Sequence, residues 1–259
     1  SGNTDLAAGS TVTITVTDSV GTVQTFTATV DANGDFSADV PNPMADGNFD
    51  VTATATDAAG NTATDTVSGD INSAAPTLSL DPLGSGNDTT PTISGNTDLA
   101  PGSTVTLTVT DSAGNTQTFS AIVQGDGSFT ADVPASLPEG DYSVTATATD
   151  GAGNSASVTE NGGNIDTTAP SITIDTQGLG NDATPSISGT TDLNAGDTVS
   201  ISVTDNAGNT QTFTATVQND GTYSAFVPAD LAEGSFSVTV TATDMEGNEV
   251  ERTINNLDV

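Results

Sequence analysis

Residues 103–123 read STVTLTVTDSAGNTQTFSAIV. In the first part Val105, Leu107 and Val109 alternate with threonine, and after the turn Phe119 begins a second run with apolar residues at every other position. This spacing is typical of a strand with one buried face. The DSAGN between the two runs has the composition of a tight turn. The stretch therefore predicts a β-hairpin, and nothing in the chain has the pattern of a helix.

The hairpin is part of a long repeat. SGNTDL occupies residues 1–6 and again 94–99, and SGTTDL occupies 188–193, which gives steps of 94 − 1 = 93 and 188 − 94 = 94 residues. Two further markers, TDSAGN and ATDGAGN, recur with the same period, which is a strong signal for tandem units. The first unit has no counterpart of the segment that precedes residue 94. We divide the chain into residues 1–72, 73–166 and 167–259.

The second unit contains seven alternating segments separated by turn residues. Seven short strands in one unit are typical of an immunoglobulin-like sandwich. We therefore predict an all-β fold of tandem seven-stranded immunoglobulin-like β-sandwiches in a linear array. Each unit places three aromatic residues on the inward face, whereas Phe226 falls on the outward face. The strands are expected near residues 77–80, 91–96, 103–110, 116–123, 127–133, 141–149 and 155–160.

Composition excludes several classes of partner and ligand. The chain has 34 acidic side chains and one basic side chain, and its net charge is −33. Nucleic acid and anionic membrane surfaces are excluded because almost nothing could neutralise phosphates. No apolar run approaches the roughly 20 residues of a membrane span. Without cysteine or histidine, neither disulfides nor zinc sites built on those residues can form. Hard, oxygen-liganded cations remain, with calcium first and magnesium second.

The motif Asp-x-x-Gly-Asn occurs five times intact, and it has two interpretations. In the first, the aspartate caps a turn, the glycine takes a positive φ and the asparagine tolerates a left-handed conformation. In the second, the acid binds a metal ion. Capping is favoured in the turns at Asp111 and Asp205, where metal binding stays open. Metal binding is favoured in the turns at Asp150 and Asp244, because topology brings them to other acids.

The alternation of strand direction places four carboxylates at the second junction between units. They come from four separate segments, a pattern that suits the six to eight oxygen ligands of calcium. The same argument at the first junction gives three acids, with Asn72 as a weaker neutral ligand. The alternative interpretation is a solvated acidic surface. The predicted metal ligands are Glu139, Asp166, Asp192 and Asp244 at the second junction, and Asp46, Asp98 and Asp150 at the first.

An enzyme is not predicted. Paired carboxylates alone could hydrolyse glycosides, but such a site needs aromatic walls, and the patterned aromatic residues are already used in the cores. No histidine is available as a general base. No Gly-x-Ser-x-Gly motif or phosphate-binding loop is present.

The linker DTTAP followed by SITID, then NDATPSISGTTD, GDTVSISVTD, NAGN, EGSFSVTVTATD and EGN, resembles the bacterial immunoglobulin-like repeats of giant repeats-in-toxin and biofilm-associated adhesins. The resemblance covers nearly the whole chain. It implies an extender region that projects a distal ligand-binding region from the bacterial cell surface, with calcium at the domain junctions. It also implies type I secretion, which fits the lack of an N-terminal signal peptide. The chain departs from the pattern at Asn72 and at Gly21-Thr22.

The predicted function is thus a structural spacer for cell adhesion, rigidified by calcium. Its expected partners are calcium ions and neighbouring repeats of the same chain, with no nucleic acid and no direct membrane insertion, and its expected state is a monomeric rod outside the cell. The alternative is that one repeat is itself a glycan- or protein-binding module. In that case Phe226 and Met245, which depart from their counterparts in the other units, are the positions to probe.

Overall fold

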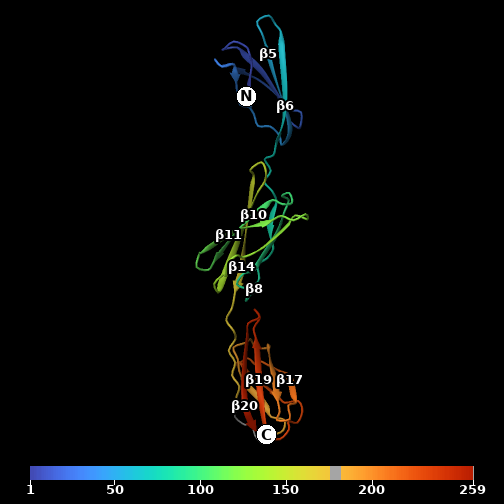
Figure 1. Cartoon of the computed structure of the whole chain (residues 1–259), viewed down its shortest axis with the longest axis vertical. Helices are drawn as coiled ribbons and strands as arrows, with labels where there is room; N and C mark the ends of the chain where they lie inside the picture. Colours follow the sequence, from blue (N-terminus) through green and yellow to red (C-terminus); the bar gives the residue numbers. More distant parts are fainter. Residues whose placement is uncertain (176–181, 259) are drawn as a thin grey trace. The chain divides into compact units, whose positions relative to one another are not determined.

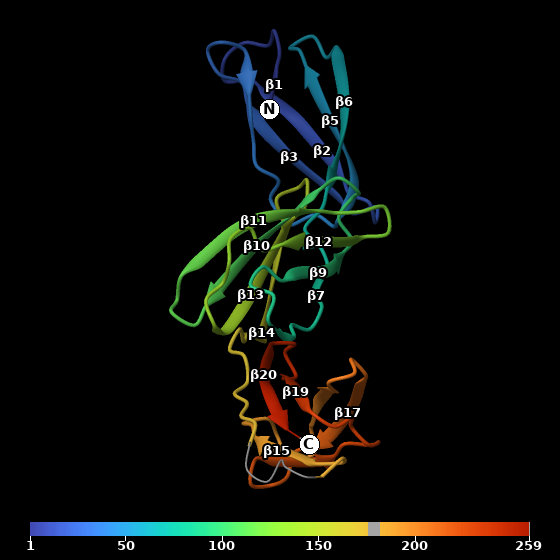
Figure 2. The same cartoon turned by 60° about the horizontal axis from the view of Figure 1, so that its bottom comes forward.

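The second repeat of the computed structural model, which describes residues 1–175 and 182–258 of the chain, shows how the alternating segments pair. One sheet has the order β11-β10-β13-β14-β8, and the other has the order β12-β9-β7, with these three strands side by side (Figure 2). The strands are β7 (Leu78–Leu80), β8 (Ser85–Gly86), β9 (Thr92–Thr97), β10 (Thr104–Asp111), β11 (Thr116–Ile122), β12 (Ser128–Asp132), β13 (Gly140–Thr149) and β14 (Ser155–Ile165).

These strands confirm the predicted all-β, immunoglobulin-like fold, with two differences. The last strand continues to Ile165 rather than ending near residue 160. The short strand β8, which the sequence did not indicate, pairs in parallel with the end of β14, with Ser85 opposite Asn164. The second difference arises because the chain between β7 and β9 crosses from one sheet to the other and adds β8 to the edge of the larger sheet.

The third repeat has the same two-sheet plan. Its larger sheet has the order β17-β16-β19-β20, and β15 pairs with β18. An isolated bridge joins Ile172 to Thr191, and a second joins Asp175 to Ser188. Residues 176–181 and 259, which fall in the predicted third unit, lie outside the described residues. The strands are β15 (Ser186–Thr190), β16 (Thr198–Thr204), β17 (Thr210–Thr216), β18 (Thr222–Phe226), β19 (Ser235–Thr243) and β20 (Glu249–Asp258).

The first repeat has a reduced smaller sheet. The order β3-β2-β5-β6 matches the larger sheet of the other repeats, but the smaller sheet holds only β1 and β4 (Figure 1, blue to cyan). Its strands are β1 (Gly2–Asn3), β2 (Thr11–Thr17), β3 (Val23–Thr29), β4 (Asp35–Phe36), β5 (Gly47–Thr56) and β6 (Thr62–Ile71).

The period-two alternation produces the cores. In β10, Val105, Leu107 and Val109 are fully buried, whereas the threonines at positions 104 and 106 are exposed. The ring of Phe129 lies over Gly95, where a Cβ atom would be 2.6 Å from the ring. The inward-facing aromatic residues are buried or half-buried. Phe226 is 72% exposed, as its outward register predicts.

The chain divides into two compact units, which are Ser1–Thr77 with Ala148–Ala156, and Leu78–Thr147 with Ser157–Val259. The turn at Asp150 therefore packs with the segment that contains Asn72. The boundaries at residues 72/73 and 166/167 stay a prediction. The described part of the chain contains no helix, and so none that is long and apolar enough to cross a membrane.

Candidate metal centres in the linker segments

The Asp-x-x-Gly-Asn turns share one hydrogen-bonding arrangement, which the turn at Asp150 illustrates. The Oδ1 atom of Asp150 accepts hydrogen bonds from the backbone amides of Ala152 at 2.9 Å and Asn154 at 2.8 Å. Its Oδ2 atom accepts one from the side-chain amide of Asn154 at 2.9 Å. Gly153 has a φ of 95°, as predicted. The asparagines of these turns do not adopt the left-handed conformation that this residue type tolerates, since among the described residues Asn256 alone has a positive φ outside glycine.

The turn between β16 and β17 supports the capping interpretation for Asp205. This aspartate is only 7% exposed. Its carboxylate accepts hydrogen bonds from the Ala207 and Asn209 backbone amides, from the Asn209 side chain and from the Ala232 amide. The Asn209 side-chain amide is the first cause that holds the pKa of Asp205 below its ordinary value. A carboxylate with this many protein donors stabilises the turn without a metal ion.

Three carboxylates converge on the second linker. Ligand oxygens of Asp166, Asp244 and Glu246 all lie within 4.8 Å of one another. The side-chain amide of Asn248 donates to the backbone carbonyl of Asp166 at 3.0 Å and to Asp244 Oδ2 at 2.9 Å. This amide fixes the linker against the turn between β19 and β20.

The donor set of these three residues fits a hard divalent cation. All the side-chain ligands are carboxylate oxygens, which calcium and magnesium prefer. Hydrogen bonds from Asn248 help to hold the pKa of Asp244 below its ordinary value, although burial acts in the opposite direction and is the largest single influence. Asp244 is therefore ionised at neutral pH. With one basic residue in the whole chain, a bound cation is the available means of neutralising the cluster.

The other two predicted ligands of this linker hold it by hydrogen bonds. Glu139 accepts from the hydroxyl groups of Thr167 at 3.0 Å and Thr168 at 2.7 Å. These bonds, first that from Thr168, lower the pKa of Glu139. Asp192 accepts from the backbone amide of Ser171 at 2.8 Å. Neither acid belongs to the group of three, and their role as metal ligands stays a prediction.

The first linker is held by a related set of contacts with fewer charges. Asp46 accepts from the amide of Ser73 at 3.2 Å and from its hydroxyl at 2.7 Å. Asn154 donates to the carbonyl of Asn72 at 3.0 Å, as Asn248 does to Asp166. Asn72 presents its amide nitrogen, which donates to Asp150 Oδ2 at 2.8 Å. A neutral donor thus lies beside Asp150, where the second linker has Asp166 beside Asp244.

Two further residues complete the comparison with the sequence. Asp98 directly follows β9 and is exposed, and its predicted role as a ligand stays a prediction. Glu246 was missed. The signal that could have found it is the turn sequence Asp-Met-Glu-Gly-Asn at residues 244–248, which carries a second acid where residues 150–154 read Asp-Gly-Ala-Gly-Asn.

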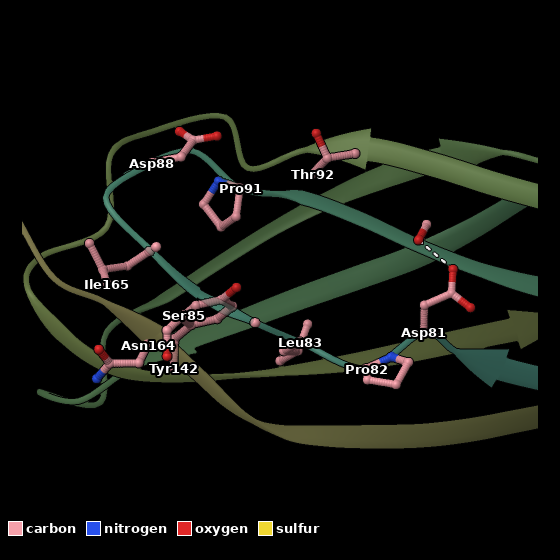
Figure 3. Close-up of a pocket in the computed structure, with 13 residues that line it drawn as sticks. Asp81, Pro82, Leu83, Ser85, Asp88, Pro91, Thr92, Tyr142, Asn164 and Ile165 are labelled. Carbon is pink, nitrogen blue, oxygen red and sulfur yellow. Dashed lines mark hydrogen bonds between the residues drawn. The ribbon is translucent and has the colours of Figure 1, made fainter. Parts of the chain in front are cut away.

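A small pocket in the second repeat bears on the alternative of a ligand-binding module. It has a volume of about 190 Å³, below the several hundred Å³ of typical small-molecule sites. Figure 3 shows Leu83 and Ser85 of the segment around β8 near Tyr142 of β13, with Asp88 farther along the same segment. Burial, together with the charge of Asp88, raises the pKa of Tyr142. The pocket is lined largely by the chain's own segment around β8. This lining supports a structural role for the pocket rather than ligand binding.

The fold and the acidic linkers define a protein of tandem β-sandwich repeats. A family model described as the bacterial Ig-like domain matches residues 3–72, 84–176 and 168–259. The chain belongs to this family of bacterial immunoglobulin-like repeats, which is a non-enzymatic kind of protein. No curated protein matches the chain significantly.

Several solved structures are similar to the chain. A tetra-tandem repeat in the extending region of a large adhesion protein is 36% identical, with a TM-score of 0.35, over 98% of this chain and 68% of that chain. A Ca²⁺-stabilized adhesin that helps an Antarctic bacterium reach out and bind ice is 29% identical, with a TM-score of 0.45, over 98% and 66%. This chain thus spans about two thirds of the length of each.

Proposed function

We propose that this chain is a structural spacer in a bacterial cell-surface adhesin, and that calcium bound at its linkers restricts their motion. The observation that carries the proposal is the convergence of Asp166, Asp244 and Glu246 within 4.8 Å on a linker that Asn248 also holds. Membership of the bacterial Ig-like family and the similarity of the tandem repeats support a role in which length matters more than recognition.

The physical basis is charge neutralisation. Without a cation, the three carboxylates repel one another and favour linker conformations that separate them. A calcium ion bound by these oxygens would connect the linker that precedes the third repeat to the turn between β19 and β20. Carbonyl groups and water would complete its six to eight ligands. Interfaces between small domains otherwise permit relative motion. The linker would then keep one conformation.

Calcium is favoured over magnesium as the bound ion, and an extracellular location is favoured over an intracellular one. Magnesium demands near-ideal octahedral geometry and dehydrates reluctantly, whereas the acids here come from a linker and a turn. Calcium sites of extracellular modules have dissociation constants of about 10⁻⁴–10⁻³ M, a range that suits three carboxylates on a partly exposed surface. We accordingly propose an extracellular location at the bacterial surface. Type I secretion and a distal ligand-binding region remain part of this proposal.

Small-angle scattering with calcium, with magnesium and with chelator tests the spacer proposal on the whole chain. The expected result is a longer and narrower distance distribution in calcium. The double variant Asp166→Asn with Asp244→Asn should lose most of this response. The matched control is Glu249→Gln with Glu251→Gln, which removes the same charge from exposed positions of β20 and should respond as the unmodified chain does.

Calcium titration followed by calorimetry separates binding from stiffening. Glu246→Gln should weaken binding at the second linker, because it removes one of three ligands, while Glu249→Gln should not. Unchanged scattering in calcium, with binding still present in the calorimeter, would mean that the ion is bound but does not restrict the linker. Absence of both responses would leave the acids as turn caps and surface charge.

A further inference from the structure

Strand β14 of the second repeat contains one residue more than its counterpart β6 in the first. In both repeats an aromatic ring of the preceding strand lies over a glycine, with Phe49 over Gly69 and Tyr142 over Gly163. The threonines at positions 66 and 159 bond the equivalent threonine of the preceding strand. From that threonine to the glycine there are 69 − 66 = 3 steps in β6 and 163 − 159 = 4 in β14. The extra residue, together with the φ of 92° at Gly162, is typical of a β-bulge.

The bulge carries an Asn-Gly pair on the surface. Asn161 and Gly162 are both exposed, and the side chain of Asn161 makes no hydrogen bond within the described part of the chain. Nothing lies within 4 Å of the position that a Cβ atom on Gly162 would take. Glycine also leaves its backbone nitrogen free to approach the side chain of the residue before it. Asn154, by contrast, uses its side-chain amide to hold Asp150 and precedes a serine.

We propose that Asn161 is a site of spontaneous deamidation, and that its isoaspartate product lengthens the backbone of β14 by one atom. The backbone nitrogen of Gly162 attacks Cγ of Asn161 and forms a succinimide ring. The proton of that nitrogen passes through water to the side-chain amide, which leaves as ammonia. Water then opens the ring. Cleavage of the Cγ–N bond gives aspartate, whereas cleavage of the original peptide C–N bond gives isoaspartate, in which the chain runs through Cβ and Cγ.

The longer backbone changes the register of the end of β14. Beyond the bulge, the amides of Asn164 and Asp166 donate to the carbonyl groups of Gly84 at 3.2 Å and Gly86 at 3.1 Å. Asn164 lies opposite Ser85 in this parallel pairing (Figure 3). The pairing depends on the spacing between the bulge and these amides, because register fixes which groups face each other. An additional backbone atom at position 161 therefore weakens the contact between β14 and β8.

The other Asn-Gly pair of the sequence, Asn33 with Gly34, is an internal reference. The amide of Gly34 donates to the carbonyl of Asp31 at 3.3 Å, and its carbonyl accepts from the amide of Thr4 at 2.8 Å. A Cβ atom on Gly34 would lie 2.5 Å from the Thr4 carbonyl oxygen, so little space surrounds this glycine. Folding should therefore protect Asn33 from ring closure more strongly than it protects Asn161.

Ageing of the whole chain in mildly alkaline buffer, with and without concentrated urea, tests the site. Pepsin digestion and mass spectrometry follow the conversion of amide to acid, and electron-transfer fragmentation distinguishes isoaspartate from aspartate. In the folded chain we expect Asn161 to convert at nearly the rate seen in urea, Asn33 several-fold more slowly than in urea, and Asn154 not measurably. Protection of Asn161 equal to or greater than that of Asn33 would overturn the proposal, as would conversion to aspartate without isoaspartate.

Hydrogen exchange tests the structural consequence. In the aged chain, the amides of Asn164 and Asp166 should exchange several-fold faster than in the fresh chain, because local opening is easier once their pairing with β8 is weakened. Asn161→Gln keeps the amide but closes a ring far less readily, so its exchange should not change with age. Asn161→Asp adds the charge without the additional backbone atom and should exchange as the fresh chain does. Equal acceleration in fresh Asn161→Asp, or none in the aged chain, would contradict the change of register.

Discussion

The side-chain amide of Asn248 donates a hydrogen bond of 3.0 Å to the backbone carbonyl of Asp166, which lies 82 residues earlier. Asn154 donates in the same way to Asn72, at the same distance and the same separation in sequence. The final asparagine of the turn thus has a role beyond its own turn, since it also binds the preceding linker. The two linkers share this contact although their charges differ.

Replacement of Asn248 by alanine should release the linker. The change removes the bonds to Asp166 and Asp244, each worth about 1 kcal/mol in a typical protein. We expect faster hydrogen exchange at Asp166 and Thr168, and a lower unfolding temperature for the third repeat. The matched control is Asn209→Ala, because within the described residues the side-chain amide of Asn209 bonds the aspartate of its own turn and no linker carbonyl. If Asn209→Ala accelerates exchange at the linker as strongly, the contact with Asp166 does not hold the linker.

Two substitutions should give the first linker a metal site like the one proposed for the second linker. Asn72→Asp restores the acid found at Asp166, and Ala152→Glu restores that found at Glu246. Together they place three carboxylates around Asp150, where the amide of Asn72 now donates to that residue. Calorimetry should show additional calcium binding, and each single variant should show less than the double one. A double variant whose calcium stoichiometry stays that of the unmodified chain would contradict the proposed ligand set.

Acid should destabilise the turns in a defined pH range. The pKa of Asp205 lies below its ordinary value of 3.8, first because of the Asn209 side chain. The unfolded chain therefore binds the proton at a higher pH than the folded chain does. The contribution is present above about pH 4 and is lost as the pH falls through the folded pKa. Relief of repulsion among 34 acids acts in the opposite direction, so the total stability alone is not diagnostic.

The comparison of the unmodified chain with Asp205→Asn isolates this effect. Urea unfolding should show the variant less stable at pH 7, and this difference should shrink as the pH falls from about 4 through the lower folded pKa of Asp205, below which both chains carry a neutral group. The variant Asp182→Asn serves as a control, because Asp182 is an exposed acid that also accepts a hydrogen bond from a backbone amide two residues on. A difference that does not depend on pH would mean that the charge of Asp205 contributes nothing to the turn.

Gly95→Ala should destabilise the second repeat severely. The new Cβ atom would lie 2.1 Å from the Ser79 carbonyl and 2.6 Å from the Phe129 ring, so β7 would have to move away. Steric overpacking of this kind costs about 1–3 kcal/mol. Gly125→Ala is the matched control, since nothing lies within 4 Å of its Cβ position. Urea unfolding followed by circular dichroism measures both, and equal stability would show that β7 does not require the close approach.

The fold could be predicted in detail because its signal is local. In residues 103–123 the alternation of valine, leucine and threonine determines which face of each strand is buried. Because the sequence markers recur in all three repeats, the same strand pattern is predicted for each of them. A strand period of two and a tight turn act over a few residues, so the sequence contains them directly. The outward position of Phe226 follows from the same register, and its exposure confirms it.

The candidate site depended on contacts between distant segments. The sequence brought Asp166 and Asp244 together through the alternation of strand direction, but it did not reveal that Glu246 joins them or that Glu139 binds the hydroxyl groups of Thr167 and Thr168. Nor did it reveal that Asn72 faces Asp150 with its amide nitrogen. Such contacts depend on the direction of single side chains across about 82 residues of chain, and on the path by which the linker leaves the sheet. Residue identity determined the strands, and tertiary packing alone decided which acids share one site.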